Sequence, residues 1–335
     1  MKKLLHFMPD LFTWAIVGTM VVASFLPCYG QGAVVFGHLT TIAIAFMFFM
    51  QGARLSRQAV IAGMAHWRLH LTILGSTFLL FPLLAFGFHA LFPHFLSPQI
   101  MIGLLYISLL PSTVQSSIAF TSMSYGNVPA AICAATFSTI LGVVVTPIAA
   151  GLLLKTHGGG DWHSIAHVFA ELLLPFVLGQ LLRPWLAAWA ARNQELLKFT
   201  DRGSIILVVY TAFSEAVVGG IWHKLPLSGF VGIMIANAVL LAAVLVLTTF
   251  GSRLLGFAKP EEIAIVFCGS KKSAATGVPM ANILFGASTV GFVVLPLIIF
   301  HQMQLIVCAV IAKHYARQHE EAQKPAASEA GSAQA

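Results

Sequence analysis

The sequence has very little charge: Asp, Glu, Lys and Arg make up 9% of its 335 residues, whereas hydrophobic residues make up 58%. Soluble globular domains carry about 25% charged residues, so this composition excludes a water-soluble fold. Apolar runs of about 20 residues, the length that crosses a bilayer, recur along the chain with few interruptions. The sequence therefore predicts a single all-α membrane domain with no separate soluble domain.

Signals of other functional classes are also absent. The net charge is +7, but the basic residues stand singly or in pairs at the ends of apolar runs and form no basic face that would bind nucleic acid. The four cysteines have no metal-ligand spacing and predict no disulfide framework. No span contains a GxSxG, HExxH or paired-Asp motif, so we expect neither an enzyme nor a cofactor.

Ten apolar segments are predicted to span the membrane. They cover residues 11–29, 34–53, 69–92, 99–125, 128–154, 164–189, 203–222, 228–256, 260–285 and 288–314. Asp10 and the length of the first apolar run favour an uncleaved helix over a signal peptide, and the stretch 54–67 is better suited to the membrane interface. The transporter domain is expected to cover residues 1–316, and residues 317–335 to form a disordered cytoplasmic tail.

The distribution of Lys and Arg predicts the orientation of the chain. With a cytoplasmic N-terminus, all but four of the 18 basic residues lie on the cytoplasmic side. Lys155 and Lys224 lie on the other side, and Lys271 and Lys272 lie inside a span. The positive-inside rule therefore predicts a multi-pass protein of the cytoplasmic (inner) membrane with both termini in the cytoplasm.

Polar residues interrupt the fourth and ninth predicted spans, at Pro111–Ser117 and at Gly269–Gly277. Backbone groups freed at membrane depth are tolerated only inside protein or beside a polar cavity. The breaks lie five spans apart, and because five is odd, a second five-helix unit crosses the membrane in the opposite sense. Matched breaks of this kind indicate a transporter of two inverted repeats, about 1–154 and 160–316, with its site where the broken helices meet.

The first break is rich in polar side chains, namely Ser112, Thr113, Gln115, Ser116 and Ser117. These residues predict a ligand or ion cradle of hydroxyls, an amide and unwound carbonyls. The alternative is a proline kink in which Ser and Thr satisfy freed backbone groups, although a kink needs fewer such residues.

The second break contains two lysines, Lys271 and Lys272, flanked by Ser270 and Ser273. An ammonium near the bilayer centre costs at least about 2.5–3.5 kcal/mol, so a buried and incompletely paired lysine predicts a functional role. Snorkelling to an interface is the alternative, but apolar residues on both sides keep the pair near mid-depth. Glu215, inside the seventh span, is predicted to be a counter-charge or proton carrier, or alternatively a protonated carboxyl in helix packing.

The chain resembles the bile acid:sodium symporter family, and within it the branch typified by solute carrier family 10 member 7. The segment Gly269–Pro279 carries the most specific part of this resemblance, supported by the segments Pro111–Ser117, Thr146-Pro147, Asp201–Ser204 and Tyr210–Ser214. The resemblance implies ten helices in two inverted repeats, with a panel domain that rocks against a core domain.

The resemblance also implies differences between this chain and sodium-coupled members of the family at the positions of their sodium ligands. It implies that Cys268 stands in place of a Glu ligand, Lys272 in place of a Gln ligand, and Thr77 in place of another Gln. Ser116 and Ser117 would remain as sodium ligands if sodium binds. A fixed ammonium repels sodium, so ordinary sodium symport is not expected.

Together these features predict a secondary transporter that moves a small organic anion by alternating access. Lys271 and Lys272 would pair with the substrate or replace a bound cation, and coupling would involve protons or exchange. Two alternatives remain open: a regulatory membrane protein with a transporter fold that affects ion homeostasis, and a sodium-coupled bile-acid-like symporter. The expected partners are the organic anion and the lipid bilayer.

Overall fold

The computed structural model describes residues 11–54, 66–154, 162–220 and 226–332. These residues form helices joined by short turns, and no strand occurs among them, so the all-α prediction is confirmed for this part of the chain. Most of the predicted interfacial stretch 54–67 lies outside the described residues.

The helices follow one another along the chain with short connections. In chain order they are α1 (Leu11–Phe25), α2 (Gln31–Arg54), α4 (Trp67–Gly75), the π-helical η3 (Ser76–Leu80), α5 (Phe81–Leu91), α6 (Pro98–Leu109), α7 (Gln115–Met123), α8 (Val128–Leu154), α9 (Trp162–Arg192), α10 (Gln194–Val218), α12 (Leu227–Leu254), α13 (Lys259–Gly269), α14 (Ala274–Leu284) and α15 (Ala287–Ser332).

Each predicted span corresponds to one helix or to consecutive helical segments. Among the described residues, six stretches are long and apolar enough to cross a membrane: Gln31–Arg54, Trp67–Leu91, Val128–Leu154, Leu172–Arg192, Leu227–Leu254 and Thr289–Glu321. Shorter apolar helices include Trp14–Phe25 in α1 and Pro98–Leu109 in α6. The fourth and ninth predicted spans are each divided into two short helices, α6 with α7 and α13 with α14.

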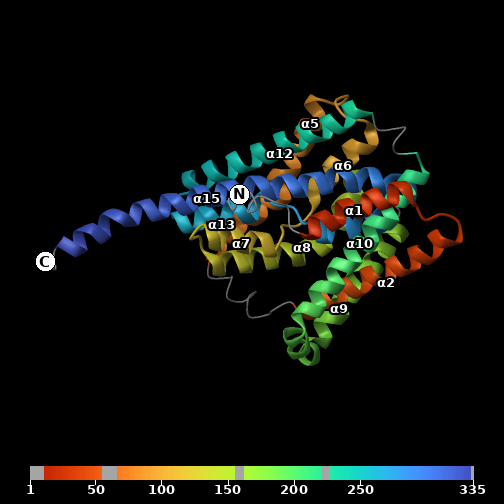
Figure 1. Cartoon of the computed structure of the whole chain (residues 1–335), viewed down its shortest axis with the longest axis horizontal. Helices are drawn as coiled ribbons and strands as arrows, with labels where there is room; N and C mark the ends of the chain where they lie inside the picture. Colours follow the sequence, from red (N-terminus) through yellow and green to blue (C-terminus); the bar gives the residue numbers. More distant parts are fainter. Residues whose placement is uncertain (1–10, 55–65, 155–161, 221–225, 333–335) are drawn as a thin grey trace.

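The helices pack as two groups (Figure 1). In one group, α2 lies along α9, and α10 contacts both α1 and α2. In the other, α15 contacts α6, α7, α12 and α14, and α13 packs against α7, α8 and α12. Contacts of α10 with α14 and α15 join the two groups. Both broken spans belong to the second group.

Glycines allow α2 and α9 to approach closely. A Cβ added at Gly52 would lie 2.0 Å from the carbonyl oxygen of Phe176, and one added at Gly179 would lie 1.9 Å from that of Phe49. Small residues of this kind are typical of helix contacts in membranes, where close van der Waals packing drives association. The first group is also fastened by Arg54 at the end of α2, which donates two hydrogen bonds of 2.8 and 2.9 Å to Asp201 of α10.

The last helix is longer than the last predicted span. α15 runs from Ala287 to Ser332, whereas the sequence predicts a span over 288–314 and disorder from residue 317. In Figure 1 its C-terminal part extends beyond the other helices.

Candidate functional site

The break between α6 and α7 exposes carbonyl groups at the end of α6. Pro111 has no N–H and cannot continue the helix, so Leu110 turns into an extended conformation after α6 ends at Leu109. The carbonyl groups of the last turn then need partners outside the helix. The Thr146 hydroxyl of α8 donates to the Leu109 carbonyl oxygen at 2.8 Å. The carbonyl oxygens of Ser108 and Leu110 are satisfied by the second break.

Lys272 satisfies these carbonyl groups from the break between α13 and α14. Its Nζ donates hydrogen bonds of 2.7 Å to the Ser108 oxygen, 2.8 Å to the Leu110 oxygen and 2.7 Å to the Thr77 oxygen. The ammonium also lies 4.3 Å from the ring centroid of Phe81. The side chain is fully buried, and all three of its N–H donors are used. We call the three carbonyl oxygens of Thr77, Ser108 and Leu110 the carbonyl cradle.

The third oxygen of the cradle is available because of the π-helical turn η3. The Phe81 N–H donates to the Ser76 oxygen, five residues back, rather than to the Thr77 oxygen. The partner of Thr77 in this π pattern would be residue 82, which is proline and has no N–H. The Thr77 carbonyl is therefore left for Lys272, whereas its hydroxyl donates to the Ile73 oxygen at 2.9 Å. The structure thus places the predicted residue Thr77 at the site through its backbone.

Lys271 points to a different helix. Its Nζ donates a 2.8 Å hydrogen bond to the Ser116 oxygen in the first turn of α7. The same nitrogen lies 3.9 Å from the ring centroid of Phe120 and 5.3 Å from that of Phe267. The side chain is fully buried. The segment is unwound, as the sequence predicts, but the two ammonium groups do not share one set of partners.

Serines of the first break donate hydrogen bonds to the carbonyl groups at the C-terminal end of α13. The hydroxyl of Ser112 donates to the Cys268 oxygen at 2.6 Å, and that of Ser117 donates to the Phe267 oxygen at 3.0 Å. The Thr113 hydroxyl lies 2.7 Å from the Ser116 hydroxyl and 3.2 Å from that of Ser117. The freed carbonyl groups at the ends of α6 and α13 thus accept hydrogen bonds from side chains of the opposite break.

The remaining predicted residues of the breaks differ in their surroundings. The Ser273 hydroxyl accepts a hydrogen bond from the Thr276 N–H and caps α14, and the Ser270 hydroxyl donates to the Val266 oxygen at 2.5 Å. Gln115 is exposed at the start of α7, and no hydrogen bond joins its side chain to another described residue. Glu215 is half-buried near the end of α10, and no ion pair joins it to a described residue.

Gln304 is a residue of the site that sequence reasoning did not identify. From α15, its side chain accepts a hydrogen bond from the Lys272 N–H and donates one to the Lys272 carbonyl, both at 2.8 Å. Its nitrogen also lies 2.8 Å from Nδ1 of His301. Gln304 is fully buried and holds the backbone of Lys272 in the unwound conformation. A glutamine inside a long apolar span was the available signal.

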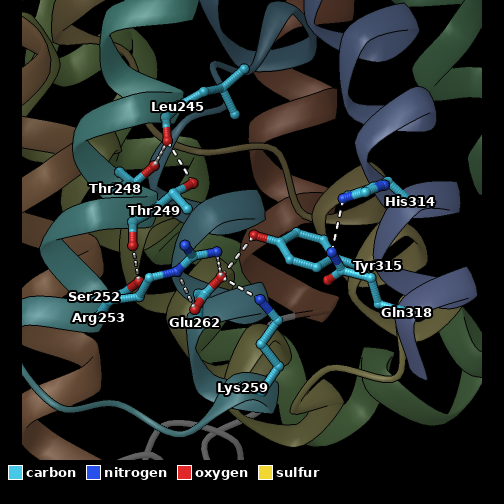
Figure 2. A network of polar contacts seen from close by, with 10 residues as sticks. All are labelled: Leu245, Thr248, Thr249, Ser252, Arg253, Lys259, Glu262, His314, Tyr315 and Gln318. Atoms are coloured by element: carbon cyan, nitrogen blue, oxygen red, sulfur yellow. Dashed lines mark hydrogen bonds and ion pairs between the residues drawn. The ribbon is translucent and has the colours of Figure 1, made fainter. Parts of the chain in front are cut away.

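A second polar network lies at the far end of α13 (Figure 2). The buried carboxylate of Glu262 accepts hydrogen bonds from Arg253 at 3.0 and 3.0 Å, from Lys259 at 2.8 Å and from the Tyr315 hydroxyl at 3.0 Å. The network joins α12, α13 and α15. In the sequence, Arg253 and Lys259 served only to predict the membrane orientation. The three-residue spacing of Lys259 and Glu262 could have indicated an ion pair on one helix face.

Almost the whole chain is similar to known proteins. Residues 10–317 match the SBF-like CPA transporter family. The chain belongs to this family. It is 53% identical over 319 residues to an uncharacterized protein of Pseudomonas aeruginosa, covering 95% of this chain and 96% of that protein.

Two further relatives carry functional names. A putative symporter of Escherichia coli, YfeH, is 52% identical over 315 residues, covering 94% of this chain and 95% of that protein. The sodium/bile acid cotransporter 7 of Rattus norvegicus is 28% identical over 308 residues, covering 89% and 91%. The predicted resemblance to the bile acid:sodium symporter family is confirmed, and the SBF-like chain is a multi-pass membrane transporter.

Proposed function

We propose that this SBF-like protein is a secondary transporter that moves an organic anion across the cytoplasmic membrane by alternating access, without ordinary sodium symport. The names of its relatives, a symporter and a sodium/bile acid cotransporter, support solute transport. Both termini would lie in the cytoplasm, as the distribution of Lys and Arg predicts.

The observation that carries the proposal is the position of the Lys272 ammonium in the carbonyl cradle. Carbonyl oxygens of unwound helices are the groups that coordinate sodium in transporters of this general design. Here they already bind a positive charge that is part of the protein. A sodium ion about 4 Å from that charge would be repelled by about 4 kcal/mol at an effective dielectric constant of 20. The tethered ammonium thus takes the place of a coupling cation.

The ten-span architecture is the second part of the proposal. Repeat one would cover 1–154 and repeat two 160–316, related by inversion in the membrane plane. The group of α1, α2, α9 and α10 would form the panel domain, and the other helices the core. The packing of α2 along α9 within the first group and the breaks in the fourth and ninth spans support this arrangement. Rocking of one group against the other would alternately expose the site.

The substrate would bind where the breaks cross. The hydroxyls of Thr113 and Ser116, the exposed amide of Gln115 and the first turn of α7 offer hydrogen-bond donors to an anion. Both lysines supply positive charge, and a transported anion would balance it. Glu215 is the candidate proton carrier because it is a half-buried carboxyl on a helix that contacts both groups.

The test is flux in sealed liposomes containing the purified full-length protein. Uptake of organic anions, with benzoate, glutarate and cholate as the first probes, should persist when sodium is replaced by choline at constant pH and voltage. It should respond to a pH gradient, and Glu215→Gln should weaken that response. A saturable and strict requirement for sodium would contradict the assignment of Lys272 as the resident cation. Absence of flux for a broad panel of anions would favour the regulatory alternative.

A further inference from the structure

Lys271 and Lys272 are adjacent in sequence, yet their ammonium groups bind different partners. The residues between α13 and α14 are not helical, and the two side chains leave the backbone toward different helices. Lys272 reaches the carbonyl cradle, whereas Lys271 reaches α7. We propose that Lys271 alone pairs with the transported anion, an organic carboxylate, and that Lys272 keeps its carbonyl partners. This inference rests on the proposed transport function.

The hydrogen-bonding capacity of the two ammonium groups distinguishes them. An ammonium has three N–H donors. Lys272 uses all of them on buried carbonyl oxygens. A carboxylate could bind Lys272 only by displacing one of these carbonyl groups, which would leave a buried acceptor unsatisfied. Lys272 is therefore occupied before any substrate arrives.

Lys271 has capacity left. Among the described residues it makes one hydrogen bond, to the Ser116 oxygen, and its nitrogen lies beside the rings of Phe120 and Phe267 and near the thiols of Cys268 and Cys308. Ring faces stabilise a cation without using a lone-pair acceptor, and a charge-assisted hydrogen bond to a carboxylate is stronger than a bond to a neutral group. A carboxylate can therefore bind the remaining donors of Lys271 while the ammonium keeps its ring contacts.

The charge balance of the site points in the same direction. Within the described part of the chain, the ion pairs engage Arg54 with Asp201, Lys198 with Glu195, and Arg253 and Lys259 with Glu262. None of these carboxylates pairs with Lys271. A buried charge without a counter-charge is unfavourable, so an incoming anion gains from neutralising it.

The location of Ser116 indicates the route to Lys271. Lys271 itself is fully buried, but its acceptor Ser116 is half-buried and the neighbouring Gln115 is exposed. An anion that reaches the first turn of α7 therefore lies beside the residue whose carbonyl oxygen binds Lys271.

The test compares Lys271→Met, Lys271→Arg and Lys272→Met in the full-length protein, with benzoate, glutarate and cholate as probes. Binding is followed by the rise in melting temperature with probe concentration, and flux is measured in liposomes from the same preparations. We expect at least one probe to stabilise the wild type. Lys271→Met should fold normally and bind that probe about tenfold or more weakly, since a charge-assisted pair is lost. Lys271→Arg should restore much of the affinity.

The outcomes separate this inference from the proposed function. Lys272→Met should melt at a lower temperature than the wild type, yet the folded fraction should still bind the probe. Lys271-dependent binding without flux would support the inference and contradict transport. Flux and binding that are unchanged in Lys271→Met would overturn the inference and leave transport standing. Loss of probe affinity in Lys272→Met equal to that in Lys271→Met, or no stabilisation of the wild type by any probe, would also overturn it.

Discussion

The backbone N–H of Ser273 donates a 2.9 Å hydrogen bond to the carbonyl oxygen of Pro111, which joins the two helix breaks directly. Both residues are within their unwound segments, where the backbone has no helical partner for these groups. A second direct link runs from the Tyr106 hydroxyl of α6 to the Gly277 oxygen of α14 at 2.8 Å. The four half-helices are therefore held as one unit, which would move together in any rocking motion.

The carbonyl cradle predicts the effect of removing the Lys272 ammonium. Lys272→Ala leaves three buried carbonyl oxygens unsatisfied, at about 1–3 kcal/mol each, partly offset because a buried charge is removed. We expect a net loss of about 2 kcal/mol, measured as a lower melting temperature in detergent. Lys198→Ala, which removes a half-exposed lysine paired with the exposed Glu195, is the control and should leave the melting temperature nearly unchanged.

Sodium should partly restore the Lys272→Ala variant. The vacated cradle presents carbonyl oxygens, which are hard ligands suited to a small cation. Sodium chloride should therefore raise the melting temperature of this variant more than choline chloride at equal ionic strength, and the wild type should not distinguish the two salts. Equal responses of variant and wild type would show that the cradle does not accept a cation.

The Ser117 hydroxyl should contribute to stability rather than only to ligand binding. It is fully buried and donates to the Phe267 oxygen at the end of α13. Ser117→Ala leaves that carbonyl without its hydroxyl donor, which should cost about 1–3 kcal/mol of stability. Ser122→Ala, at an exposed position of the same helix, is the matched control and should be close to neutral. Equal melting temperatures for the two variants would contradict this role of Ser117.

The Glu262 network should stabilise the N-terminal end of α13 against unfolding. Glu262→Gln removes the negative charge that holds Arg253 and Lys259, and the amide nitrogen cannot accept their hydrogen bonds. Because both basic side chains are about half exposed, at 50% and 46%, they can turn to water, so we expect a loss of about 1–3 kcal/mol. Glu261→Gln, next in sequence and outside the network, should cost less than half as much. Thermal unfolding of the two variants decides the point.

The native cysteines provide a test of orientation. Cys133, Cys268 and Cys308 are buried, whereas Cys28 is partly exposed in the turn between α1 and α2. With a cytoplasmic N-terminus this turn faces the outside, so a membrane-impermeant maleimide should label intact cells at Cys28, and Cys28→Ser should abolish the labelling. Arg192→Cys in the Cys28→Ser background should react only after permeabilisation. The reverse pattern would invert the proposed topology.

The helices could be predicted closely from the sequence because a bilayer imposes a strict length on each apolar run. The predicted span 128–154 coincides with α8, and the predicted interruptions begin where α6 and α13 end. They were predicted too long, because residues 115–117 already belong to α7 and residues 274–277 to α14. Pro111 alone explains one interruption, since it lacks an N–H wherever it is placed. The predicted association of the two breaks also holds, because freed backbone groups at membrane depth need partners from the protein.

The pairing of Lys272 was not predictable in the same way. The sequence indicates an incompletely paired ammonium, whereas the structure gives it three carbonyl partners from η3 and from the end of α6. All three partners are far away in the chain, since Thr77, Ser108 and Leu110 are separated from Lys272 by 195, 164 and 162 residues, and their freed carbonyl groups carry no side-chain signal. Gln304 is visible as a glutamine in an apolar span, but its partner could not be predicted, because that partner is the backbone of Lys272.

The sequence by itself determined that the chain is an apolar helical membrane protein with two polar breaks and two lysines in the second. Local chemistry suffices for these features, since they follow from hydropathy, from proline and from charge. Only the tertiary structure decided what each lysine binds, because adjacent residues of an unwound segment can reach different helices. Packing brings the carbonyl groups of α6 to Lys272 and the rings of Phe120 and Phe267 to Lys271, and this difference in partners separates two residues of identical chemistry.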